Sequence, residues 1–115
     1  MRAYNWNELP GHEGAGDGRA RRVVEGDRIT ILRQTIQKGY PTGGPHTHPH
    51  EQISIVMEGR ARFTCDGESV ELGPGGVVVF PGGSLHETQN IGGADLTVEE
   101  VFSPVNEMLR KYAPK

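Results

Sequence analysis

The chain has 115 residues and a formal net charge of −3, so it fits one domain and offers no basic surface that could neutralise a nucleic-acid backbone. No apolar run approaches the roughly 20 residues that cross a bilayer, and Met1–Gly18 lacks the apolar stretch of a secretion signal. We therefore expect a cytoplasmic protein that binds neither nucleic acid nor membrane. A single cysteine, Cys65, excludes an internal disulfide.

Glycine is the compositional outlier, with 17 residues of 115, about twice its usual share of about 7%. These glycines lie between short apolar runs, which favours many tight turns. Residues 1–24 are polar and glycine-rich, and we predict a loop-rich N-terminal arm there, with the basic run Arg19–Arg22 as a solvated part of it. The folded domain is predicted to cover 25–115.

The domain is predicted to be all-β. Alternating or apolar runs predict strands at 28–38, 53–57, 60–64, 70–72, 77–80, 85–89 and 96–102. Asp66-Gly67 is typical of a hairpin turn, and residues 107–112 are predicted to form a short helical segment. Short strands at such regular spacing indicate a sandwich or barrel.

Three histidines and one glutamine form a candidate metal site. His46 and His48 are two residues apart, so on an extended chain both imidazoles face the same side. Gln52 keeps this parity, whereas Glu51 is one step off and faces the other side. His86 joins from a separate strand. Three imidazoles and one amide oxygen predict a site for one divalent transition metal: zinc, nickel, manganese or iron.

The remaining histidines are weaker candidates. His50 shares the parity of His48, so it stays open as a ligand or as a group that supports a ligand. His12 falls in the predicted arm and is not expected to take part.

Two segments of the sequence resemble the two signatures of the cupin superfamily. The first is His46-Thr47-His48, three residues, Gln52, six residues and Gly59; the second is Gly75, five residues, Pro81-Gly82-Gly83-Ser84-Leu85-His86, three residues and Asn90. The resemblance covers about 25–102. It implies a single-domain jelly-roll (double-stranded β-helix) barrel, a metal held by the four residues above, and a homodimer.

Gln52 stands where the first signature usually carries glutamate. A neutral donor set leaves the full double charge on the metal, which favours polarisation of a substrate oxygen over redox chemistry. Four protein ligands also leave positions for water or a small-molecule substrate on a five- or six-coordinate metal.

A finer resemblance links the chain to the pectin-degradation cupins, which convert 4,5-unsaturated uronates into linear ketonised sugars. It rests on the segment 46–52, the Pro-x-Gly-x-x-His motif and the ending Glu100-Val101-Phe102-Ser103-Pro104. The resemblance implies proton transfer by Glu100, where that family has aspartate, and a pocket wall at Phe102. The family arginine for the substrate carboxylate is replaced by Asn106, and Arg110, one helical turn later, is the substitute candidate.

Three functions follow from these observations. The first is a Lewis-acid isomerase or lyase that acts on a small sugar acid. The second is a dioxygenase that uses iron, manganese or nickel with the same ligands. The third is a metal-dependent module that binds a small molecule without turnover.

Overall fold

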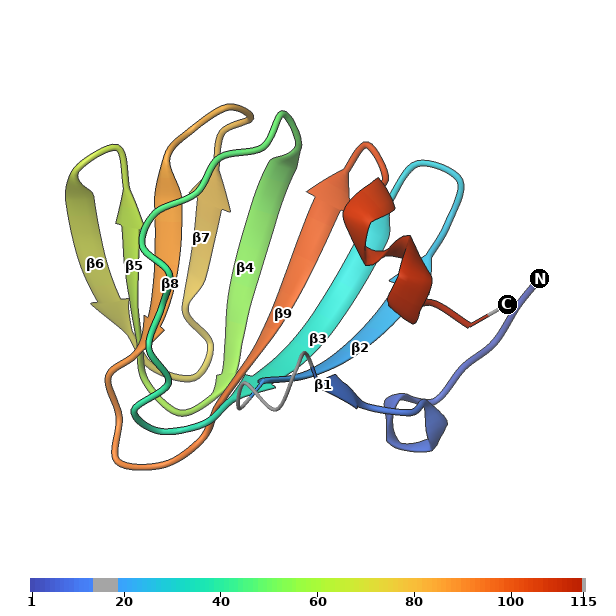
Figure 1. Ribbon diagram of the computed structural model, residues 1–115, viewed down its shortest axis with the longest axis horizontal. Coiled ribbons are helices and arrows are strands. Elements are labelled where there is room, and N and C mark those ends of the chain that lie inside the picture. The colour runs from blue at the N-terminus through green and yellow to red at the C-terminus, as the bar shows by residue number, and fades with distance from the viewer. Residues whose placement is uncertain (14–18, 115) are drawn as a thin grey trace.

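A computed structural model describes residues 1–13 and 19–114 (Figure 1). Within these residues, nine strands and two short 3-10 helices make up the regular structure, which confirms the all-β prediction. The elements are η1 Trp6–Glu8, β1 His12–Glu13, β2 Arg19–Glu25, β3 Thr30–Ile36, β4 Glu51–Glu58, β5 Ala61–Cys65, β6 Glu68–Leu72, β7 Val77–Phe80, β8 His86–Asn90, β9 Leu96–Ser103 and η2 Glu107–Tyr112. None of the described helices is long and apolar enough to span a membrane.

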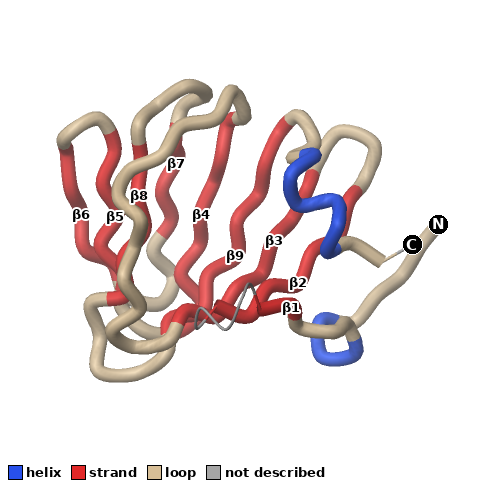
Figure 2. Tube along the Cα trace, in the orientation of Figure 1, coloured by secondary structure: helices blue, strands red, loops and turns tan. Residues whose placement is uncertain are grey.

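The strands form two antiparallel sheets (Figure 2). The larger sheet has the order β1-β2-β3-β9-β4-β7, and the smaller has the order β6-β5-β8. The final strand β9 lies in the middle of the larger sheet, between β3 and β4. There, Glu100 is paired with Leu32 on one side and Ser54 on the other.

The larger sheet extends further toward the N-terminus than the sequence predicts. Residues 12–13 form β1 and residues 19–25 form β2, which pairs with β3 in full register, so strands of this sheet lie within the predicted arm 1–24. Arg21 and Val23 are buried, while Arg22 and Val24 are less so. The alternation of a strand is therefore present, but charged residues hide it in the sequence.

One end of the space between the sheets is closed by an apolar cluster. Phe63 of β5 packs against Phe80 of β7, with ring centroids 6.0 Å apart. The cluster comprises Ile36, Val56, Ala61, Phe63, Phe80, Leu96 and Val98, each no more than 4% exposed. It joins both sheets into one core. The polar side chains that line the cavity lie at the opposite end of the space between the sheets.

The segment 37–50, which links β3 to β4, crosses in front of the smaller sheet (Figure 1). Its main chain is fastened there by hydrogen bonds. His46 and His86 each donate an N–H to the carbonyl of the other at 2.9 Å. Gly83 donates its N–H to the carbonyl of His48, also at 2.9 Å. These bonds hold the histidines of the linking segment beside the first residue of β8.

Candidate metal centre

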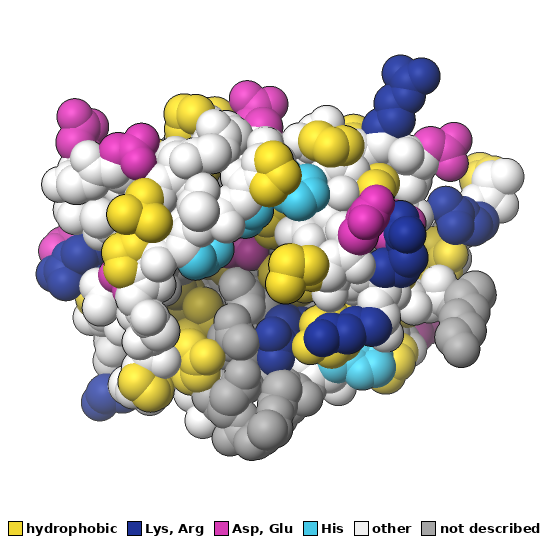
Figure 3. Space-filling view, turned by 45° about the horizontal axis from the view of Figure 1, so that its top comes forward, with side chains coloured by type: hydrophobic (Ala, Val, Ile, Leu, Met, Phe, Trp, Pro, Cys, Tyr) yellow, Lys and Arg dark blue, Asp and Glu magenta, His cyan; other side chains and the backbone are white. Residues whose placement is uncertain are grey.

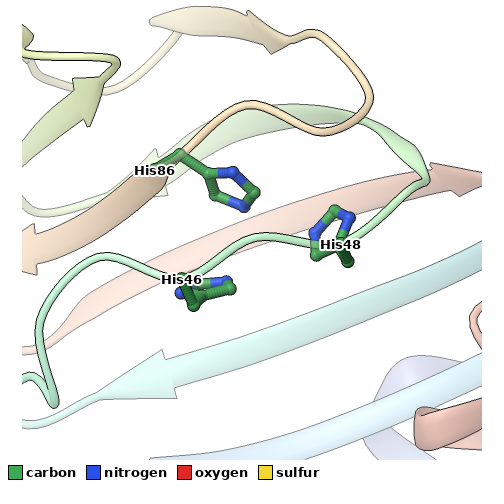
Figure 4. Close-up of side chains that lie close together, drawn as sticks. All are labelled: His46, His48 and His86. Carbon is green, nitrogen blue, oxygen red and sulfur yellow. The ribbon is translucent and has the colours of Figure 1, made fainter.

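Three histidines converge at the open end of the fold (Figure 4). His46 and His48 come from the linking segment and His86 from the start of β8. One ligand nitrogen from each ring lies within 4.8 Å of the others, so the cluster can hold a metal ion. His86 is buried, while His46 is exposed to solvent, which leaves the cluster open on one side.

The hydrogen bonds of His86 direct a lone pair into this cluster. Its Nδ1 lies 3.1 Å from the carbonyl of Ser84, an acceptor, so Nδ1 carries the proton. Among the described residues, Nε2 is buried with no hydrogen-bond partner. Phe80 stacks on the ring at 4.5 Å and fixes its plane. Burial lowers the pKa of His86, which keeps the ring neutral and able to bind a metal.

His48 and Gln52 present a second pair of acceptors. The Nδ1 of His48 donates to the carbonyl of His50 at 3.1 Å, so Nε2 carries a lone pair. That Nε2 lies 3.0 Å from the Oε1 of Gln52, whose amide nitrogen donates to Ser54 at 2.9 Å. Two acceptors this close repel each other unless a cation lies between them. The hydrogen bonds around His48 and Gln52 thus orient two acceptors beside a histidine cluster that can hold a metal ion.

Gln52 and Glu51 lie on the two faces of β4 that the sequence predicts. Gln52 is 3% exposed, and Glu51 is exposed on the outer side of β4. However, His46 and His48 do not lie on a continuous strand with Gln52, because the chain bends at 49–50.

His50 lies behind the cluster. Its Nε2 donates to the carbonyl of Val105 at 3.1 Å, and its own carbonyl holds His48 in place. Its ring does not belong to the group of nitrogens that could share a metal. Of the two roles left open for His50, the structure supports the one behind a ligand.

A cavity of about 430 Å³ adjoins the histidines. Glu100 and Phe102, both from β9, line it together with His48 and Gln52. They are 5% and 4% exposed, and the ring of Phe102 lies 5.6 Å from that of His48. In Figure 3, histidine side chains follow one border of this hollow and basic side chains the opposite border. The size and the mixed lining suit a small polar molecule.

Arg110 does not line this cavity. Its guanidinium Nε donates to the two carboxylate oxygens of Glu25 at 3.0 and 3.1 Å on the surface. The cause is the position of Asn106, which caps η2: its side chain accepts from the N–H of Met108, and its own N–H donates to the hydroxyl of Thr30 on β3. This cap sets a direction for η2 that carries Arg110 toward β2.

The cavity instead contains Arg21 of β2, a residue that the sequence reading assigned to a solvated arm. Arg21 is only 9% exposed. The signal that could have found it is the two-residue alternation of Arg21 and Val23 against Arg22 and Val24.

Comparison with known proteins places these features in a family. The model of the cupin domain matches residues 32–102. An uncharacterized protein of Streptomyces coelicolor, SCO3923, is 29% identical over 90% of this chain and 97% of its own length. Germin-like protein subfamily 1 member 4 of Arabidopsis thaliana is 33% identical over 78% of this chain. The match covers 48% of that relative, so the chain spans about half of it.

Solved structures show the same arrangement of strands. An RmlC-like cupin from Shewanella frigidimarina superposes with a TM-score of 0.81 at 24% identity, covering 95% of this chain and 96% of that one. KdgF from Halomonas superposes with a TM-score of 0.76 at 26% identity, covering 84% and 88%. The two signatures, the two facing sheets and the histidine cluster thus agree with the matched model, and the chain belongs to the cupin family.

Proposed function

We propose that this protein is a metal-dependent isomerase or lyase that acts on a small sugar acid, with 4,5-unsaturated uronates as the leading substrate class. The observation that carries the proposal is the meeting of two chemical groups in one cavity. A neutral donor set that fits a metal faces the same space as the buried carboxylate of Glu100.

The proposed ligands are His46, His48, His86 and Gln52, for one divalent ion of zinc, nickel, manganese or iron. In support, the Oε1 of Gln52 lies at ligand-to-ligand distance from His48 and is oriented by Ser54. A metal bound there supplies Lewis acidity toward a substrate oxygen. Because all four donors are neutral, they do not offset the metal charge, which favours this chemistry over oxidation.

Glu100 is the proposed acid and base. In the ring form of a 4,5-unsaturated uronate the double bond carries the ring oxygen, so the hemiacetal must open first. The bond from C1 to the ring oxygen breaks, C1 becomes an aldehyde, and the proton of the C1 hydroxyl moves to the former ring oxygen, which gives the enol. The carboxylate oxygen of Glu100 then accepts the proton of this enol hydroxyl and returns a proton to the other carbon of the double bond, so that C=C–O–H becomes H–C–C=O. Atoms and charge balance, and no redox partner is needed. The position of Glu100 between Leu32 and Ser54 on the inner face of the sheet restricts its side chain. A positioned acid or base of this kind typically contributes about 10²- to 10⁴-fold to a rate.

The relatives give further support. KdgF from Halomonas is 26% identical over most of both chains. The pectin-degradation cupins, which this sequence resembles in three segments, perform the ketonisation proposed here. Phe102 then forms an apolar wall beside the ring of His48.

The direct test uses the unsaturated uronates released by a pectate or alginate lyase. Protein loaded with each candidate metal should remove their double-bond ultraviolet absorbance and yield the ketonised sugar by proton NMR. Chelation should abolish the conversion, and added metal should restore it. Oxygen uptake coupled to turnover would favour the dioxygenase, and substrate binding without conversion would favour the binding module.

We also propose that two copies pair through the outer face of the larger sheet. Val24, Ile31, Val101, Ile53 and Val79 occupy matching register positions across five strands and form one apolar row. Val79 is 56% exposed. Light scattering should give a dimer mass at micromolar concentration, and Val79→Lys should give a monomer. A monomeric wild-type protein would rule out this pairing.

A further inference from the structure

Two polar side chains face the cavity from β2 and β3, apart from the metal centre and Glu100. Arg21 and Gln34 are paired in register on neighbouring strands, and both line the cavity. They are 9% and 7% exposed. Neither has a part in the proposed metal binding or proton transfer.

Gln34 carries an acceptor that no described residue satisfies. Its Oε1 is buried and has no hydrogen-bond partner within residues 1–13 and 19–114. A buried acceptor without a donor destabilises a fold, and a leucine of similar size would avoid that loss. The missing donor is supplied if the cavity holds a ligand with a hydroxyl group.

Arg21 brings a permanent positive charge to the same place. A guanidinium stays protonated when buried and can stack with its face while its N–H edge binds a carboxylate in two hydrogen bonds. The Cζ of Arg21 lies 5.1 Å from the centre of the Tyr112 ring. Its neighbour Arg22 differs, because its Nε donates to the carbonyl of Leu9 and it does not line the cavity.

We propose that Arg21 and Gln34 form a subsite for a hydroxy acid, in which Arg21 binds the carboxylate and Gln34 accepts a hydrogen bond from a hydroxyl of the same molecule. The inference builds on the proposed function and names the groups that select its substrate class. It gives Arg21, rather than Arg110, the contact with the carboxylate.

The test compares galacturonate with galactose, which differ in the group at C6, a carboxylate or a hydroxymethyl. Binding to metal-loaded and metal-free protein is followed by NMR titration. Wild type should prefer galacturonate in both forms. Arg21→Gln should weaken galacturonate binding roughly 10- to 150-fold, the range for a hydrogen bond to a charged group, and should leave galactose unchanged. Arg22→Gln, the matched control on the opposite face, should behave as wild type.

Gln34→Leu separates a ligand-binding role from a structural one. It should weaken binding of both sugars while it raises the melting temperature of the unliganded protein. A lowered melting temperature with unchanged binding would overturn the role of Gln34.

The carboxylate contact is overturned if wild type shows no preference, if Arg21→Gln keeps it, or if the preference exists only with metal. These outcomes are independent of turnover. A protein that ketonises nothing yet binds galacturonate through Arg21 refutes the proposed function and supports the subsite. If the protein ketonises uronates and Arg21→Gln leaves the KM for the uronate unchanged, the proposed function is supported and the subsite is refuted.

Discussion

The two ends of β9 bury their inward side chains in opposite surroundings. Leu96 and Val98 are fully enclosed in the apolar cluster that joins the sheets. Glu100 and Phe102, on the same face of the same strand, line the cavity beside the histidines. One strand thus runs from a closed apolar end to an open end that carries polar groups, where Phe102 also packs in a second apolar cluster with Val23 and Leu32.

The hydrogen bonds show what separates these ends. At the open end, His86, His50 and Gln34 each have a buried polar atom without a partner among the described residues. Each such atom typically costs about 1–3 kcal/mol of folding free energy. The apolar end has contacts that stabilise the fold, whereas the open end keeps the Nε2 of His86 and the Oε1 of Gln34, whose partners a metal and a ligand would supply. Changes at the open end should therefore alter binding and turnover, and changes at the apolar end should alter stability.

The largest effect is expected from His86→Ala. Removal of a proposed ligand should lower metal affinity more than the roughly 10- to 100-fold typical of groups behind a ligand, and turnover should disappear with the metal. Elemental analysis of purified protein measures this. His12→Ala is the control, since the ring of His12 packs against Tyr112 and does not line the cavity. Equal metal content in both variants would refute the site.

Glu100→Gln should reduce turnover about 10²- to 10⁴-fold and leave the metal content unchanged. The measurement is kcat on unsaturated uronate with metal-loaded protein. Glu99→Gln provides a matched control, because Glu99 is on the opposite face of β9 and pairs with Arg33 at 3.5 Å. Full activity in Glu100→Gln would remove it as the acid and base.

Leu96→Ala tests the apolar end of the same strand. A buried leucine truncated to alanine typically costs about 2–5 kcal/mol of unfolding free energy, because apolar contacts are lost and a cavity remains. Urea unfolding measures the change, and metal bound per folded chain should not alter. If metal binding falls as much as in His86→Ala, the two ends are not independent.

The smallest effect is expected from pH on the metal-free protein. Burial lowers the pKa of His86 in the folded state below its ordinary 6.5. As pH falls below about 6.5, the unfolded chain therefore takes up a proton before the folded one does, and the unfolding free energy decreases. Urea unfolding at pH 7.5 and 5.5 should show this slope, and His86→Gln should flatten it. A metal-free wild-type protein with the same unfolding free energy at both pH values would contradict a lowered pKa of His86.

The sequence was sufficient to predict the strands from residue 28 onward and the histidine cluster, for identifiable reasons. Strand 77–80 has the predicted bounds because four apolar residues lie between glycine turns. His46, His48 and His86 could be predicted because the two-residue spacing of the first two places their side chains on one face, and the glycine turn before His86 starts a new strand. Both are local properties of the chain. The exposed Glu51 and buried Gln52 match the predicted faces, although the bend at 49–50 interrupts the strand on which that parity was counted.

Arg21 and Arg110 show where such reasoning ends. A charged residue in a run of arginines is normally solvated, and only the pairing of β2 with β3 turns Arg21 inward. The direction of η2 depends on how Asn106 binds Thr30, a residue 76 positions earlier. The alternation of Arg21 and Val23 against Arg22 and Val24 fits a strand, but which face turns inward is set by the pairing with β3. The direction of η2 likewise depends on a contact between distant segments.

The mutual hydrogen bonds between the main chains of His46 and His86 bear on ion selectivity. They fix the separation of the two main chains that carry these donor rings before any ion arrives, so the backbone limits how far the rings can adjust to an ion. An ion whose preferred bond lengths or angles differ from those that this spacing allows must strain the two hydrogen bonds. An ion that matches the spacing binds without rearrangement. The order of affinities among divalent first-row ions can then depart from the intrinsic order, which rises from manganese to copper and falls at zinc.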